Sequence, residues 1–188
     1  MLAAVRETNP AWASEIRSQT HEILRHVERE LARARSAAGH GDAVRDLREL
    51  VSGIVKTIEK LPRSESMTFN LDLPDGIGVR MDKDDLTEII ANLLDNARKW
   101  AKCKINVSLV LRDGQQWLEV CDDGPGVSPQ MISALGSRGL RLDERTLGTG
   151  IGLAIVRDLL DANGLEVHFT NAQPSGLRVQ FQLPLTPP

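Results

Sequence analysis

One predicted helix carries polar side chains at a spacing that would align them. Glu88, Asn92 and Asn96 are four residues apart and Lys99 follows one turn later, so a helix brings these side chains onto one face. Asparagine is a poor helix former, and two aligned asparagines therefore indicate a use for their amides. Amide oxygens suit a hard cation such as magnesium, and a lysine suits a phosphate. A plain solvated helix face is the alternative for this segment taken alone.

Two glycine-rich segments follow farther along the chain. The first, Asp-Asp-Gly-Pro-Gly from Asp122 to Gly126, comes directly after a predicted strand. Its glycines let the backbone approach a flat ligand, and Asp122 could accept a hydrogen bond from an exocyclic amine. The second, from Gly148 to Gly152, opens a predicted helix, whose first backbone amides could bind phosphates. Taken alone, each segment is also compatible with an ordinary turn or helix entry.

Hydrophobic periodicity predicts the helices and strands that must hold these segments. Apolar residues at helical spacing indicate helices over 47–61, 83–100 and about 150–162, the first of which ends at Pro62. Alternating apolar residues indicate strands near 67–73, 79–81, 105–111, 165–170 and 177–183, and Asp113-Gly114 is typical of a hairpin turn into a strand through Val120. A further short helix is expected after the first glycine-rich segment. About six strands and four helices in this order predict an α/β fold, a two-layer α/β sandwich with a mixed sheet and helices on one face.

The first forty residues follow a different pattern. Residues 10–38 are helical in character throughout, with an apolar stripe at spacings of four and three that is typical of a helical bundle or coiled coil. A glycine-rich break follows. We therefore expect a helical segment over 1–38, a linker over 39–45 and a second domain over 46–188. The stripe consists of Thr20, Leu24, Val27, Leu31 and Ala34.

Composition and charge exclude several classes of protein. The apolar fraction of 41% and the charged fraction of 26% are ordinary for a soluble globular chain. The formal net charge of −3 gives no sign of a nucleic-acid partner. No apolar run approaches the roughly 18 residues of a membrane span. Cys103 and Cys121 have no metal-ligand spacing and are expected to be buried thiols. We expect a cytoplasmic protein.

Taken in this order, the three segments resemble the N, G1 and G2 boxes of the GHKL superfamily, which joins histidine kinases, Hsp90, type II topoisomerases and MutL. The resemblance covers roughly residues 45–185 and implies the Bergerat ATP-binding fold, with ATP and Mg²⁺ as ligands. It implies that Asn92 and Asn96 hold magnesium and phosphate, that Lys99 contacts phosphate, and that Asp122 binds the adenine amine. Trp100 falls where many such kinases carry an aromatic residue, although core packing explains it equally well. The nucleotide-binding set implied in this way is Asn92, Asn96, Lys99, Trp100, Asp122, Gly124, Gly126, Gly148, Thr149, Gly150, Gly152 and Leu153.

Within the superfamily the sequence is most similar to sensor histidine kinases. The segments Asn-Leu-Leu-Asp-Asn-Ala-Arg-Lys-Trp and Gly-Ile-Gly-Leu-Ala-Ile-Val-Arg resemble theirs, and the N-terminal helix resembles the second helix of their dimerisation hairpin. The lid over 137–145 lacks a phenylalanine-rich box and resembles the Arg-Gly-x-Arg lid of PhoQ-like kinases. Candidate catalytic residues are Glu88, Lys99, Arg138 and Arg141, the two arginines as stabilisers of charge on the γ-phosphate or else as part of an ordinary basic loop.

Two alternative functions remain open at this point. A GHKL ATPase or serine kinase of the anti-sigma-factor type would share the ATP site, but such proteins lack a dimerisation helix. A non-catalytic docking module would share only the fold, and the intact motif residues argue against it.

The phosphate-accepting histidine of such kinases has no match in this sequence. Only His21 is followed by an acidic residue, and the rest of the acceptor motif does not follow it. We therefore expect part of a longer kinase that transfers the γ-phosphoryl group of ATP to a histidine elsewhere and does not autophosphorylate by itself. The implied partners are a response-regulator receiver domain and a second copy bound through the N-terminal helix. A membrane anchor would lie in segments outside this sequence.

Overall fold

The computed structural model describes residues 43–136 and 152–185. The chain divides into two compact units, residues 1–39 and 40–188, and all described residues belong to the second. The predicted helix over 10–38 lies outside the described residues, as do five of the predicted site residues. These five are Arg138, Arg141, Gly148, Thr149 and Gly150.

The described chain alternates strands and helices in an order that brings distant segments together. The strands are β1 (Ala43–Val44), β2 (Thr68–Asp72), β3 (Val79–Asp82), β4 (Lys104–Arg112), β5 (Gln115–Asp122), β6 (Val167–Asn171) and β7 (Leu177–Gln182). The helices are α2 (Leu47–Ile58), α3 (Lys83–Trp100), α4 (Pro129–Ile132) and α5 (Gly152–Ala162).

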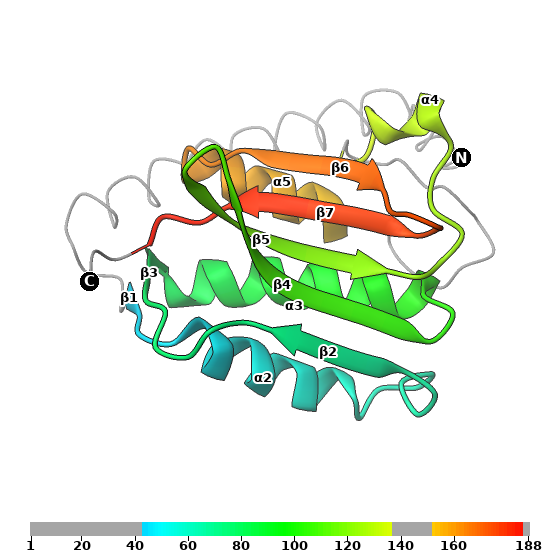
Figure 1. The fold of residues 1–188 in the computed structure, drawn as a ribbon, viewed down its shortest axis with the longest axis horizontal. Coiled ribbons are helices and arrows are strands. Elements are labelled where there is room, and N and C mark those ends of the chain that lie inside the picture. Colours follow the sequence, from blue (N-terminus) through cyan, green and yellow to red (C-terminus); the bar gives the residue numbers. More distant parts are fainter. Residues whose placement is uncertain (1–42, 137–151, 186–188) are drawn as a thin grey trace, which may run out of the picture. The chain divides into compact units, whose positions relative to one another are not determined.

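Five of the strands form one mixed sheet in the order β2-β4-β5-β7-β6 (Figure 1). Strand β2 pairs in parallel with β4, and the other neighbours pair antiparallel. The short strands β1 and β3 form a separate antiparallel pair. In Figure 1, α3 and α5 lie behind this sheet, and α2 lies beside α3 near β2. The result is a sandwich of one helical layer and one sheet layer.

The core lies between these two layers, because successive side chains of a strand point to opposite faces of the sheet and one face meets the helices. On β5, Leu118 and Val120 are buried against the helices while Glu119 between them is half-buried, and on β7 Phe181 is fully buried. Helix α3 contributes a continuous apolar face at helical spacing to the same core. That face consists of Leu86, Ile89, Ile90, Leu93, Leu94 and Ala97.

Helix α3 begins and ends where its sequence provides local signals. The carboxylate of Asp82 accepts hydrogen bonds from the backbone N–H groups of Asp84 and Asp85, at 2.9 and 3.2 Å, and so caps the first turn. Acidic residues in the first turn and the basic residues Arg98 and Lys99 in the last turn complement the helix dipole. At the far end of the neighbouring helix, the Asn163 amide donates to Asp85 at 3.2 Å and ties α5 to this cap.

The predicted α/β class, the mixed sheet and the helical layer are confirmed. Helix α2 ends at Ile58, three residues before the predicted Leu61, because the chain turns there through successive backbone bonds. Strand β1 lies within the segment predicted as a linker, and its pairing with β3 depends on a distant partner that has no local signal. No helix in the described part of the chain is long and apolar enough to cross a membrane.

Two leucines of the β4–β5 hairpin test where the core lies. Leu118 is fully buried, whereas Leu111 is 68% exposed. Leu118→Ala should lower the free energy of unfolding by about 2–5 kcal/mol, because it leaves a cavity in the core. Leu111→Ala removes the same atoms from a strand surface and should cost less than about 0.5 kcal/mol. Urea denaturation of both variants measures the difference, and equal losses would contradict the assignment of the buried face.

Candidate functional site

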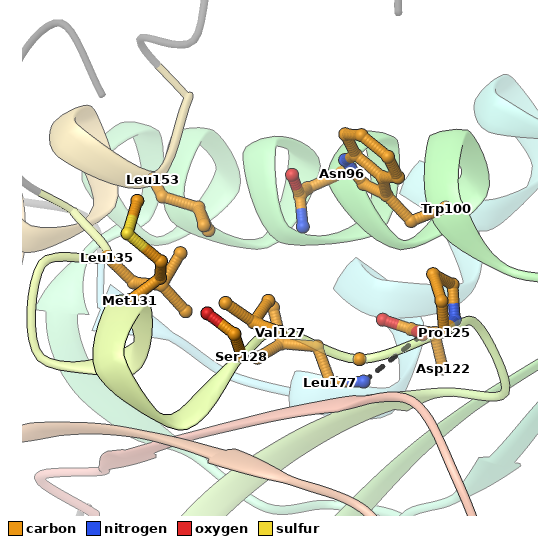
Figure 2. Close-up of a pocket in the computed structure, with 11 residues that line it drawn as sticks. Asn96, Trp100, Asp122, Pro125, Val127, Ser128, Met131, Leu135, Leu153 and Leu177 are labelled. Carbon is orange, nitrogen blue, oxygen red and sulfur yellow. Dashed lines mark hydrogen bonds between the residues drawn. The ribbon is translucent and has the colours of Figure 1, made fainter. Parts of the chain in front are cut away.

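A pocket of about 420 Å³ lies between α3 and the chain that follows β5. Figure 2 shows Asn96 and Trp100 projecting from α3 on one side, with Asp122, Val127 and Leu177 on the other. Five of the predicted nucleotide-binding residues line it, namely Asn96, Trp100, Asp122, Gly126 and Leu153. The remaining lining residues were not predicted and are mostly apolar. They are Pro125, Val127, Ser128, Met131, Leu135 and Leu177.

Asp122 is the buried charged group of this pocket, with only 5% of its surface exposed. Its Oδ1 accepts hydrogen bonds from the backbone N–H groups of Gly124 at 2.8 Å and Leu177 at 3.2 Å. Burial raises the pKa of this carboxyl, and the two backbone hydrogen bonds offset the rise only in part. Both of these bonds fall on Oδ1, so Oδ2 is the atom through which Asp122 would accept a hydrogen bond from a ligand.

The two glycines of the predicted G1 segment lie where a side chain would not fit. A Cβ at Gly124 would come within 2.4 Å of the Trp100 carbonyl oxygen. Gly126 has φ +74°, and a Cβ there would come within 2.7 Å of Asn171 Oδ1. Gly124 therefore lets the loop pack directly against the end of α3, and Gly126 provides the left-handed conformation that turns it along the pocket.

Asp123 has a structural role beside the pocket. Its carboxylate accepts hydrogen bonds from the backbone N–H of Lys102 at 2.8 Å and of Cys103 at 3.1 Å, and from the Cys103 thiol at 3.3 Å. Burial alone would raise the pKa of Asp123, but hydrogen bonding with the backbone of Lys104, with the backbone and thiol of Cys103 and with the backbone of Lys102 lowers it to about 2. The expectation that Cys103 is buried is wrong: its side chain is exposed, and its hydrogen bond to Asp123 raises the pKa of the thiol.

The β6–β7 hairpin reaches the pocket and was not predicted as part of it. Asn171, the last residue of β6, bonds to both backbone groups of Val127, and Leu177, the first residue of β7, bonds to Asp122. Asn171 and Val127 are 44 residues apart, and asparagine at a strand end also occurs in ordinary turns. The residue in the sequence that could have indicated a special turn in this hairpin is Gly176, because only a glycine readily adopts its φ of +116°.

The structure separates the three residues predicted on the polar face of α3. Asn96 lines the pocket. Asn92 lies toward the start of α5, since a Cβ at Gly152 would come within 3.1 Å of Asn92 Oδ1, and its Nδ2 donates to the Glu88 carbonyl at 2.8 Å. Glu88 itself is exposed and does not line the pocket. Among the described residues, Asn92 Oδ1 therefore lies beside Gly152, the first residue of α5.

Lys99 is held by a neighbouring carboxylate on its own helix. Its Nζ lies 2.6 Å from Asp95 Oδ2, while Arg98 donates to Asp95 Oδ1 at 2.6 Å. Burial alone would raise the pKa of Asp95, but the hydrogen bonds and charges of Lys99 and Arg98 lower it. Contact between Lys99 and a phosphate would therefore have to share the ammonium with Asp95 or displace that carboxylate.

The pocket fits an adenine nucleotide in size and chemistry. Its volume falls in the range of about 300–1,000 Å³ that small-molecule sites occupy. Apolar walls and the Trp100 ring suit a flat base, and the buried Asp122 carboxylate suits its amine. No cluster of three acidic, histidine or cysteine side chains that could hold a metal occurs over 43–136 and 152–185. A magnesium ion would therefore depend on phosphate oxygens together with amide oxygens such as that of Asn96.

Comparison with known proteins agrees with this geometry. Residues 81–187 match the family described as histidine kinase-, DNA gyrase B-, and HSP90-like ATPase. The sensor protein kinase CarS of Pseudomonas aeruginosa is 34% identical over 175 residues, which are 90% of this chain and 38% of that protein. The two-component sensor PhoQ of the same organism is 29% identical over 137 residues, 72% of this chain and 31% of that protein.

The fold has solved relatives as well. The structure of the mycobacterial sensor histidine kinase MprB superposes with a TM-score of 0.67 at 28% identity, and covers 76% of this chain and 98% of that one. The chain therefore belongs to the histidine kinase-, DNA gyrase B- and HSP90-like ATPases. Within that family, the unit over residues 40–188 is the ATP-binding catalytic domain of a sensor histidine kinase.

The low pKa of Asp123 gives the stability of the domain a defined pH dependence. Because the folded-state pKa is lowered to about 2, the stabilisation is present above the ordinary aspartate range and is lost as the pH falls toward 2. Asp123→Asn should therefore destabilise the domain most near neutral pH, and the difference from the unmodified chain should shrink below about pH 4. Urea denaturation of both chains between pH 3 and 7 measures this, and a difference independent of pH would contradict it.

Two glycine substitutions separate close packing from conformational freedom. Gly124→Ala places a Cβ against the Trp100 carbonyl and should cost about 1–3 kcal/mol. Gly53→Ala lies inside α2 where nothing is within 4 Å of the new Cβ, and should stabilise the domain by about 0.5–1 kcal/mol. Thermal denaturation of the two variants should move the midpoint in opposite directions. A neutral Gly124→Ala would show that the loop does not rest on the end of α3.

Proposed function

We propose that this domain binds ATP with Mg²⁺ in the pocket of Asn96, Trp100 and Asp122, and supplies the γ-phosphoryl group for transfer to a histidine that this chain does not contain. The observation that carries the proposal is the buried Asp122 carboxylate, which two backbone N–H groups orient at the base of an apolar pocket. A buried carboxylate is costly unless a function or a partner requires it.

The base-binding end of the pocket is proposed as the source of nucleotide selectivity. Asp122 Oδ2 would accept a hydrogen bond from the adenine amine, while Trp100 and the apolar lining enclose the ring. A guanine presents a carbonyl oxygen at the corresponding position. That oxygen would face the carboxylate without a proton between them, so the site should favour adenine.

The phosphate end is proposed to lie along the polar face of α3. Asn96 lines the pocket and Asn92 lies beside Gly152 at the start of α5. Magnesium, when bound, would neutralise charge on the phosphates. Lys99, which is paired with Asp95, would add a positive charge. Glu88, Arg138 and Arg141 remain candidate catalytic residues.

The proposed role in a whole kinase goes beyond the matched region. The chain spans 38% of the length of CarS and 31% of that of PhoQ, so activities and partners of whole sensor kinases are inferences for it. We propose transfer to a histidine on a separate dimerisation helix, and then to the receiver domain of a response regulator. We further propose a homodimer formed through the N-terminal helix and a cytoplasmic location for this domain. None of the histidines in this chain has the acceptor motif, so no autophosphorylation is expected.

Titration calorimetry with ADP and with a non-hydrolysable ATP analogue, with and without Mg²⁺, tests the proposal. Micromolar binding that magnesium strengthens is expected. Asp122→Ala should weaken both nucleotides by a similar factor of about 10–100, because both lose the same adenine contact. Asn96→Ala should mainly reduce the gain in affinity from magnesium.

Asn70→Ala is the matched control for the asparagine variant. Asn70 lies on β2 at the far edge of the sheet, where it donates to Asn106 at 2.9 Å, and it should leave nucleotide affinity unchanged. Circular dichroism should show that every variant is folded. A folded, unmodified chain that binds neither nucleotide would reject the proposal and favour a non-catalytic docking module.

A further inference from the structure

We propose that Asn171 is a positioning residue that fixes the wall of the pocket facing the nucleotide base, by holding the backbone of Val127. This inference rests on the proposed function, because it assigns the wall to an adenine site. Asn171 is the last residue of β6 and is exposed, and it does not itself line the pocket.

The contact uses both ends of the Asn171 side-chain amide. Oδ1 accepts a hydrogen bond from the Val127 backbone N–H at 2.9 Å, and Nδ2 donates to the Val127 carbonyl at 2.7 Å. The side chain thus replaces the peptide group of a neighbouring strand and pairs with one residue of the loop. Both backbone groups of a loop residue are satisfied in this way, which fixes its orientation as well as its position.

The loop held by Asn171 forms one side of the pocket. Gly126, Val127 and Ser128 all line the pocket, and Figure 2 shows Val127 and Ser128 on the side opposite α3. The approach is close, because a Cβ at Gly126 would lie 2.7 Å from Asn171 Oδ1. A shift of Asn171 would therefore be transmitted to residues that enclose the base.

The hairpin that carries Asn171 also holds Asp122. Asn171 and Leu177 are register partners at the closed end of the β6–β7 hairpin, and the Ala172 N–H donates to the Gly176 carbonyl at 2.9 Å inside the turn. The Leu177 N–H then donates to Asp122 Oδ1. One short hairpin therefore fixes both the carboxylate that would contact the adenine amine and the wall that would cover the ring. The distance between these two features depends on Asn171.

A purely structural role for Asn171 predicts a different result from a positioning role. Loss of ordinary stabilising hydrogen bonds would lower the free energy of unfolding and leave the affinity of the folded fraction unchanged. Loss of positioning would weaken adenine-nucleotide binding in a domain that is still folded. Amide exchange of residues 123–128 compared with exchange of the rest of the described sheet separates the two roles.

The test measures ADP binding by calorimetry and amide hydrogen exchange by mass spectrometry on the unmodified chain, Asn171→Ala, Asn171→Asp and the control Asn70→Ala. We expect Asn171→Ala to bind ADP about tenfold more weakly and to exchange faster only over residues 123–128. Asn171→Asp keeps an acceptor for the Val127 N–H but loses the donor to the Val127 carbonyl. Its ADP affinity and its exchange rate over residues 123–128 should therefore lie between those of the unmodified chain and of Asn171→Ala. Asn70→Ala should match the unmodified chain in both measurements.

Two outcomes would overturn the inference. If the unmodified chain binds ADP and both Asn171 variants bind ADP with an affinity within about twofold of that of the unmodified chain, the proposed function stands and the positioning role is rejected. If exchange rises throughout the sheet in proportion to lost stability, the role is structural. If Asn171→Ala does not fold, Asn171→Asp decides the question alone. Failure of the unmodified chain to bind ADP would instead reject the proposed function, and this inference with it.

Discussion

The carboxylate of Asp122 joins three parts of the domain that are distant in sequence. It lies at the end of β5, and its Oδ1 accepts hydrogen bonds from Gly124 in the following loop and from Leu177 at the start of β7. Burial makes its charge costly, and the raised pKa shows that these two bonds do not fully compensate. The close contacts at Gly124 and Gly176 follow from this arrangement, since both let backbone surround a buried carboxylate.

Helix α3 connects that arrangement to the rest of the fold. One face contributes leucine and isoleucine side chains to the core, and the other presents Asn96 and Trp100 to the pocket. Asp123 fastens the end of the helix by bonding to the backbone of Lys102 and Cys103. The adjacent aspartates therefore have different roles, because Asp122 faces the pocket while Asp123 fixes the connection between α3 and β4.

Local signals in the sequence were sufficient to predict much of this fold, but they did not predict which residues form the walls of the pocket. Helix α3 matches the predicted range 83–100, because its cap at Asp82 and its apolar period are local properties. The alternation along β4 likewise predicted its buried residues Ile105 and Val107, whereas Leu111 at the end of the same pattern is exposed. The contact between Asn171 and Val127 depends on two segments that meet only after the sheet has formed. The lining by Met131 and Leu135 depends on where the short helix α4 and the turn after it lie. No periodicity encodes such contacts.

The ion pair between Lys99 and Asp95 determines which anions this site could retain. An ammonium group that already has a carboxylate at 2.6 Å on the same helix offers little attraction to a single small anion. Such an anion must compete with a tethered partner whose effective concentration is high. A ligand that is also anchored through its base presents its phosphates to Lys99 at a high effective concentration, and can therefore compete with the Asp95 carboxylate. If Lys99 contacts phosphate as proposed, the ion pair with Asp95 would favour a polyphosphate that is anchored through its base over free phosphate or chloride.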